Sequence, residues 1–145
     1  MDLYEHLVEE YLTVFDHLAV VPQFPVLFGE DWRPRFHETP GGLTWAAYPD
    51  FLAIDARNRL AQIVEVTKSP GPNQVRNLAG RALADRARVE EYVRWFTPDS
   101  SQIHWRFFVR RERVDTLKTE LEAGGLEAAI TSLEDVFDKL RDRMP

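Results

Sequence analysis

Two carboxylates close to a lysine are the residues of this chain best suited to chemistry. Asp50 opens an apolar run at residues 51–55, and Glu65 lies inside a second apolar run at residues 60–68. A polar turn joins the two runs, so we expect a β-hairpin that can place Asp50 beside Glu65 at one end of a sheet. Paired carboxylates bind magnesium through oxygen, and a nearby Lys68 can stabilise phosphate charge or orient water. Phosphodiester cleavage uses this set of groups.

The residues Pro49-Asp50, an apolar strand and Glu65-Val66-Thr67-Lys68 together resemble the core motif of the PD-(D/E)XK nuclease superfamily. The resemblance covers roughly residues 3–109. It implies an α/β fold, with a restriction-endonuclease-like αβββαβ core and a mixed central sheet flanked by helices. It also implies a catalytic site built from Asp50, Glu65 and Lys68. In that site Asp50, Glu65 and a carbonyl oxygen of Val66 would bind Mg²⁺ or Mn²⁺, and the partner would be DNA or RNA.

The lysine of this motif is displaced by one residue. The superfamily pattern has one residue between the acid and the lysine, whereas this chain has two, Val66 and Thr67. Side chains alternate faces along a strand, so Glu65 and Thr67 share a face and Lys68 points away from it. Lys68 reaches the site only through a bulge or at the strand end. A non-catalytic member of the same fold, which binds nucleic acid or a protein partner, is therefore the alternative.

Both carboxylates also have a plainer interpretation. Pro-Asp is a common turn dipeptide, so Asp50 can simply begin a turn. Glu65 can face solvent from its strand, but Ile63, Val64 and Val66 surround it with apolar residues. A carboxylate in so apolar a strand usually has a partner or a metal. This environment favours the metal-site interpretation of Glu65.

Further candidates lie on the two helices predicted to flank the hairpin. Glu10 lies beside the apolar face of a predicted first helix, where superfamily relatives often place an acidic residue near the metal. It can equally be a boundary glutamate that reaches water. Gln74 and Arg76 lie in the first turn of the helix that follows the hairpin, where relatives often carry substrate-facing residues. Arg76 and Arg81 are the predicted nucleic-acid contacts. Thr67, with Glu10 and Gln74, is a secondary candidate for the catalytic site.

The distribution of charge supports a nucleic-acid partner more than the net charge of −6 does. Residues 56–113 carry twelve basic and six acidic groups, whereas residues 1–55 and 114–145 have net charges of −8 and −4. The basic centre includes the second strand of the hairpin and the helix after it, which border the expected site. Local fields of this kind attract phosphates. Arginines also commonly coat an exposed helix for solubility.

Length and composition bound the class of protein. At 145 residues, the chain is predicted to form a single domain, residues 1–145. It has no cysteine, which excludes disulfides and thiolate metal sites. It has no apolar run near the ~20 residues that cross a bilayer, and its first residues do not resemble a signal peptide. We therefore expect a cytoplasmic protein without membrane contacts. A mixed sheet in a chain of this size also allows a homodimer.

Hydrophobic periodicity predicts alternating helices and strands. The predicted helices span residues 3–18, 72–96 and 114–123, with a last helix that begins at Ser132. The predicted strands span residues 23–28, 43–55, 60–68, 103–109 and 126–131, and residues 29–42 are expected to form a loop. The strand at residues 43–55 is predicted to be interrupted at Pro49. This order, α-β-β-β-α-β-α-β-α, is typical of a layered α/β domain.

Overall fold

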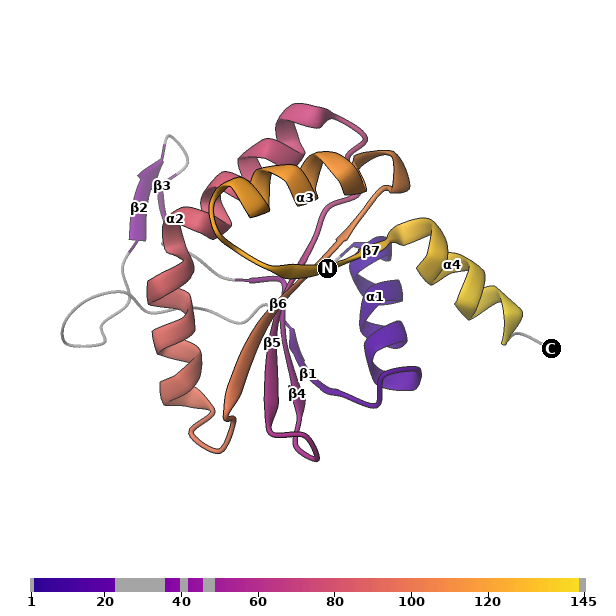
Figure 1. Cartoon of the computed structure of the whole chain (residues 1–145), viewed down its shortest axis with the longest axis horizontal. Helices are drawn as coiled ribbons and strands as arrows, with labels where there is room; N and C mark the ends of the chain where they lie inside the picture. The colour runs from indigo at the N-terminus through magenta and orange to yellow at the C-terminus, as the bar shows by residue number, and fades with distance from the viewer. Residues whose placement is uncertain (1, 23–35, 40–41, 46–48, 144–145) are drawn as a thin grey trace.

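The computed structural model describes residues 2–22, 36–39, 42–45 and 49–143. Two strands, β2 (Phe36–Thr39) and β3 (Gly42–Trp45), form a separate antiparallel pair. The other elements follow in the order α1 (Leu3–Val14), β1 (Ala19–Pro22), β4 (Phe51–Asp55), β5 (Leu60–Val66), α2 (Pro72–Phe96), β6 (Gln102–Val109), the 3₁₀ turn Arg111–Arg113, α3 (Val114–Ala123), β7 (Ala128–Ser132) and α4 (Leu133–Asp142). Figure 1 shows their arrangement.

A five-stranded mixed sheet lies at the centre, in the order β1-β4-β5-β6-β7. The β1–β4 and β4–β5 pairs are antiparallel, and the β5–β6 and β6–β7 pairs are parallel. Each parallel connection passes through a helix: α2 links β5 to β6, and α3 links β6 to β7. Parallel neighbours require such crossovers, whereas the β4–β5 hairpin needs only a short turn. The predicted α/β class with a mixed sheet is confirmed.

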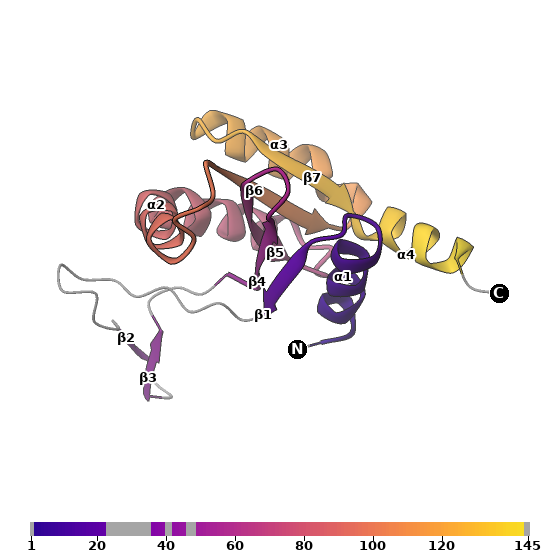
Figure 2. The same cartoon turned by 90° about the horizontal axis from the view of Figure 1, so that it is seen from below.

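The helices cover both faces of the sheet. One buried cluster joins α2 and α3 to one face, and a second joins α1 and α4 to the other. Figure 2 shows the sheet between α1 and the pair α2 and α3. Phe107 and Phe108 are neighbours on β6, both fully buried, and they enter opposite clusters. This alternation shows which face any residue of the central strands occupies.

Local sequence signals set the helix ends. Asp2 and Glu5 form a capping box at the start of α1: Asp2 Oδ1 accepts a hydrogen bond from the Glu5 N–H at 2.9 Å, and Glu5 Oε2 accepts one from the Asp2 N–H at 3.0 Å. Pro72 begins α2, where the missing N–H is harmless. Ser132 caps α4 by accepting from the Asp135 N–H at 3.1 Å. These caps fix where the helices start relative to the strands.

The prediction for the first helix and first strand was wrong at their junction. The helix ends at Val14 and not at Leu18, because His17 adopts a φ of 55° and the chain turns back. Residues 19–22 then form β1, in which Val20 and Val21 pair with β4. These two β-branched residues suit a strand, and pairing with β4 forms one where no element was predicted. The predicted strand at residues 23–28 lies outside the described residues.

The segment 43–55, predicted as one strand interrupted at Pro49, contributes to two strands in different sheets. Residues 42–45 form β3, which pairs with β2 inside the segment expected to be a loop, and residues 51–55 form β4 in the main sheet. Pro49 precedes β4, and proline cannot donate to a ladder, so the second strand begins after it. The long helix at residues 72–96 and the helix at residues 114–123 have the bounds predicted for them.

No helix in the described part of the chain is both long and apolar enough to cross a membrane. α2 is the longest of these helices at 25 residues, but it carries charged side chains on several sides.

Candidate functional site

Asp50 and Glu65 lie side by side at one end of the sheet. The β4–β5 register pairs Phe51 with Val64, so one further step along each strand brings Asp50 opposite Glu65. The two carboxyls are within hydrogen-bonding reach of each other. Asp50 Oδ2 also accepts a hydrogen bond from the Val66 N–H at 2.7 Å. The hairpin therefore brings together the two carboxylates that the sequence singled out.

Strand alternation places this pair on the face that α2 covers. Ile63, two residues before Glu65, packs in the cluster shared with α2 and α3, and so does Leu52, two residues after Asp50. Arg81 of α2 acts electrostatically on both carboxyls, and its positive charge lowers both pKa values. The site thus contains two acids from the sheet and one cation from the helix above them.

A third acid reaches the pair from α1. Glu5 raises the pKa of Asp50 both by a hydrogen bond and by its charge. The sequence analysis selected Glu10 from this helix, but Glu10 is exposed, and Glu5 in the first turn is the residue beside the pair. The capping-box spacing Asp2-x-x-Glu5 places Glu5 in the first turn of the helix but does not show that this turn faces the carboxyl pair. Helical periodicity alone does not show which helix end faces the site.

The electrostatics of the pair are unusual for carboxylates. Burial is the largest cause that raises the pKa of Asp50 to about 7, and the Val66 N–H and Arg81 only partly oppose it. Burial and then the charge of Asp50 raise the pKa of Glu65 well above its usual range. Two carboxyls that are poorly solvated and close together do not both ionise easily at neutral pH. A bound cation would relieve the repulsion between them.

Lys68 has its contacts at the start of α1, on the face of the sheet opposite α2. Its ammonium is 3.6 Å from Asp2 Oδ2 and 5.9 Å from the ring centre of Tyr4, so its contacts are with the start of α1. The side chain is 57% exposed. The Thr67 N–H donates to the Phe108 carbonyl at 3.0 Å, which continues the β5–β6 ladder past Val66 without a bulge. Regular alternation therefore turns Lys68 towards α1.

Thr67 and Gln74 belong to the turn between β5 and α2. Thr67 Oγ1 accepts a long hydrogen bond from the Ser69 N–H at 3.5 Å. The Ser69 hydroxyl donates to Gln74 Oε1 and accepts from the Gly71 N–H at 3.1 Å. These bonds hold the turn closed just beyond Val66. They position the end of β5 against the start of α2.

Arg76 and Arg81 differ in their surroundings, although both were predicted nucleic-acid contacts. Arg76 is 3.6 Å from Glu120 Oε1 on α3 and within 3.5 Å of Asn73 Oδ1. Arg81 is exposed, and its positive charge lowers the pKa values of Asp50 and Glu65. The structure therefore associates Arg81, and not Arg76, with the carboxyl pair.

The donor set suits a hard cation. Among the described residues, no three acidic or histidine side chains are grouped as a ready-made metal cage. Magnesium, however, is usually held by one or two carboxylates, with waters at the remaining positions. Asp50 and Glu65 supply two adjacent carboxyl oxygen donors in a poorly solvated place, where a bound cation would favour their ionised forms. Their chemistry therefore fits Mg²⁺ or Mn²⁺.

In comparisons with known proteins, no protein-family model, no curated protein and no solved structure matches this chain.

Proposed function

We propose that this chain is a PD-(D/E)XK-type domain that cleaves phosphodiester bonds of DNA or RNA with Mg²⁺ or Mn²⁺. The observation that carries the proposal is the adjacent placement of Asp50 and Glu65, tied to the end of β5 by the Asp50–Val66 hydrogen bond. The pair lies beneath a helix that supplies a permanent positive charge, Arg81. Two acids and a cation around one point are the groups that a phosphate and an attacking water require.

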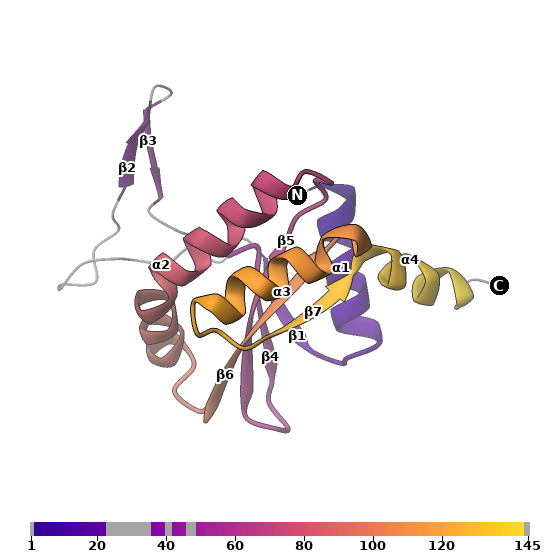
Figure 3. The ribbon, with the colours of Figure 1, turned by 45° about the horizontal axis from the view of Figure 1, so that its top comes forward.

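The order of the elements supports the same proposal. The path α1-β1-β4-β5-α2-β6 reads αβββαβ, with three antiparallel strands followed by a parallel fourth. α1 and α2 lie on opposite faces of the sheet, as Figure 3 also shows. The pair β2 and β3 then forms an insertion between the first two core strands, and α3, β7 and α4 extend the core.

The residues of the pair would have distinct tasks. Asp50 and Glu65 would hold the metal, with the Val66 carbonyl as a further ligand. The metal would polarise a phosphate oxygen and lower the pKa of a bound water. The Val66 N–H orients the Asp50 carboxylate, and the poorly solvated setting strengthens every charge interaction at the site.

Arg81 would face the phosphate in the role that the superfamily motif gives to its lysine. A guanidinium is always charged and presents several N–H groups that match phosphate oxygens. Its charge already acts on both Asp50 and Glu65, whereas Lys68 contacts Asp2 and Tyr4. This assignment gives the site a cation despite the displaced lysine.

A nicking assay tests the proposal. The purified chain is incubated with supercoiled plasmid and with a structured RNA, in Mg²⁺, in Mn²⁺ or in EDTA. We expect metal-dependent cleavage of at least one substrate, and loss of cleavage in Asp50→Asn and Glu65→Gln. Glu10→Gln is the matched control, because Glu10 is an exposed acid of α1, and it should cleave like the wild type. Cleavage that persists in EDTA, or that survives both substitutions, contradicts the proposal.

The second candidate is a non-catalytic module of the same fold that binds nucleic acid or a protein. The ion pair between Lys68 and Asp2 favours this candidate, because it ties the motif lysine to the start of α1 and not to a phosphate at the site. In this case the chain binds nucleic acid or a protein without any metal-dependent cleavage. The assay above separates the two candidates.

A further inference from the structure

β7 forms one edge of the five-stranded sheet. Among the described strands, β7 has one neighbour, β6. Residues 126–132 read Leu-Glu-Ala-Ala-Ile-Thr-Ser, without a proline or a lysine. Natural edge strands are usually protected by such residues, by bulges or by a covering element. The other edge strand, β1, has only four residues and ends in Pro22.

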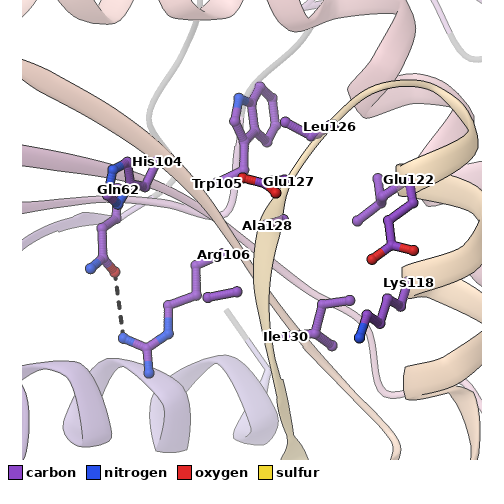
Figure 4. Close-up of a pocket in the computed structure, with 12 residues that line it drawn as sticks. Gln62, His104, Trp105, Arg106, Lys118, Glu122, Leu126, Glu127, Ala128 and Ile130 are labelled. Carbon is purple, nitrogen blue, oxygen red and sulfur yellow. Dashed lines mark hydrogen bonds between the residues drawn. The ribbon is translucent and has the colours of Figure 1, made fainter.

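An open hollow of about 460 Å³ borders β7 and extends over β6 to Gln62 of β5. Consecutive residues of the β7 segment, 126–130, line it. Lys118 and Glu122 of α3 border it on one side, and Gln62 and Arg106 border it on the other. Figure 4 shows β7 passing between these two groups of side chains. An added strand needs this arrangement: a backbone edge with room for side chains on both faces.

Charge indicates which strand fits. Lys118 and Glu122 are four residues apart on α3, so they lie one helical turn apart on the same face. Both project beside β7 (Figure 4). A two-fold axis perpendicular to the sheet pairs two β7 strands antiparallel and sets two α3 helices antiparallel next to each other. Lys118 of each copy then faces Glu122 of the other, so the surface is complementary to itself.

We propose that the β7 edge is a homodimer interface, where a second copy of this chain adds its own β7 to give one continuous sheet across both subunits. The two Lys118–Glu122 pairs between the α3 helices set the register of the two strands. The carboxyl pair at Asp50 and Glu65 lies elsewhere, on β4 and β5, so the dimer and the proposed cleavage activity can be tested separately.

Charge exchange tests this interface. Sedimentation equilibrium of the wild type should give twice the chain mass of 16.9 kDa at micromolar concentration. Lys118→Glu and Glu122→Lys should each weaken dimerisation at least ~10-fold, because like charges then meet across the axis. The double variant, with both changes in one chain, should restore the wild-type dissociation constant. Arg57→Glu makes the same change of charge in the exposed β4–β5 turn and should leave the dimer intact.

Hydrogen exchange gives a second, independent readout. Amides of residues 128–132 should exchange more slowly as the protein concentration rises through the dissociation constant, and circular dichroism should confirm that each variant stays folded. A monomer at every concentration overturns the proposal. So does a dimer that neither charge reversal weakens, or one in which exchange along β7 does not depend on concentration.

Discussion

A single hydrogen bond joins Asp50 to Val66: the carboxylate before β4 accepts from the backbone N–H at the end of β5 over 2.7 Å. The two residues are sixteen positions apart, so the bond depends on the hairpin register. It fixes the Asp50 side chain beside Glu65 while burial makes both carboxyls reluctant to ionise. Local sheet geometry thus brings together the two carboxyls on which the proposed metal site rests.

The metal-free protein should become less stable as pH rises from about 4 to about 7. The pKa of Asp50 is raised from 3.8 to about 7, so in this range the folded chain keeps a proton that the unfolded chain has lost. At pH 8, Asp50→Asn should therefore raise the free energy of unfolding by roughly 1–3 kcal/mol, on the scale of about 1.4 kcal/mol per pKa unit. Urea titrations in EDTA measure this difference, which should shrink towards pH 4.

Asp55→Asn is the control, because it should change the free energy of unfolding in the opposite direction. Hydrogen bonds from Asn58 lower the pKa of Asp55, so its contribution is present above the usual carboxyl pKa and is lost as pH falls. This variant should be slightly less stable than the wild type at neutral pH. If Asp50→Asn also destabilises the metal-free protein at pH 8, burial does not make the ionised Asp50 carboxylate costly to the fold.

Sequence reasoning succeeded where one local signal dominated. The α2 start follows from Gly71-Pro72, and the α3 end follows from Gly124-Gly125, with Gly125 at a φ of 79°. It failed where the first helix ends: periodicity extended this helix to Leu18, and the strand at residues 19–22, which depends on pairing with β4, was not predicted. The pairing of Asp50 with Glu65 was predictable because a hairpin is local. Glu5 was not, because only the packing of α1 shows which of its acids meets the sheet end.

Arg81→Gln should lower the rate of cleavage by ~10², the typical effect of removing one preorganised charge-stabilising donor. The reason is its action on both site carboxyls. Arg76→Gln is the matched control on the same helix, since Arg76 lies against Glu120, and its rate should stay near that of the wild type. Lys68→Ala should also keep most of the rate. A silent Arg81→Gln together with an inactive Lys68→Ala would return the cationic role to Lys68.

Thr67→Lys tests the non-catalytic alternative. Position 67 follows Glu65 by two, so a lysine there would share its face of the sheet. In an active nuclease that already uses Arg81, the plasmid-nicking rate should change only a few-fold. If the wild type is inactive and this substitution creates Mn²⁺-dependent nicking, the natural chain is a degenerate member of the fold that lacks only the cation.

Binding to duplex DNA should weaken steeply with salt, because residues 56–113 carry the basic excess. Each phosphate contact contributes ~0.9 to the slope of log affinity against log salt concentration. Arg81→Gln should reduce this slope by ~0.9, the contribution of one phosphate contact. Arg76→Gln should reduce the slope less, since Arg76 already pairs with Glu120. Fluorescence anisotropy in EDTA measures both slopes. Binding that is independent of salt points to a protein partner.

The central claim is that Asp50 and Glu65 form one divalent-cation site, and calorimetric titration with MnCl₂ at pH 7.5 tests it most directly. We predict one Mn²⁺ per chain for the wild type and for the exposed control Glu10→Gln. Asp50→Ala and Glu65→Ala should show no such binding while keeping the circular dichroism of the folded chain. Equal heats of Mn²⁺ binding in the wild type and both alanine variants would contradict the claim.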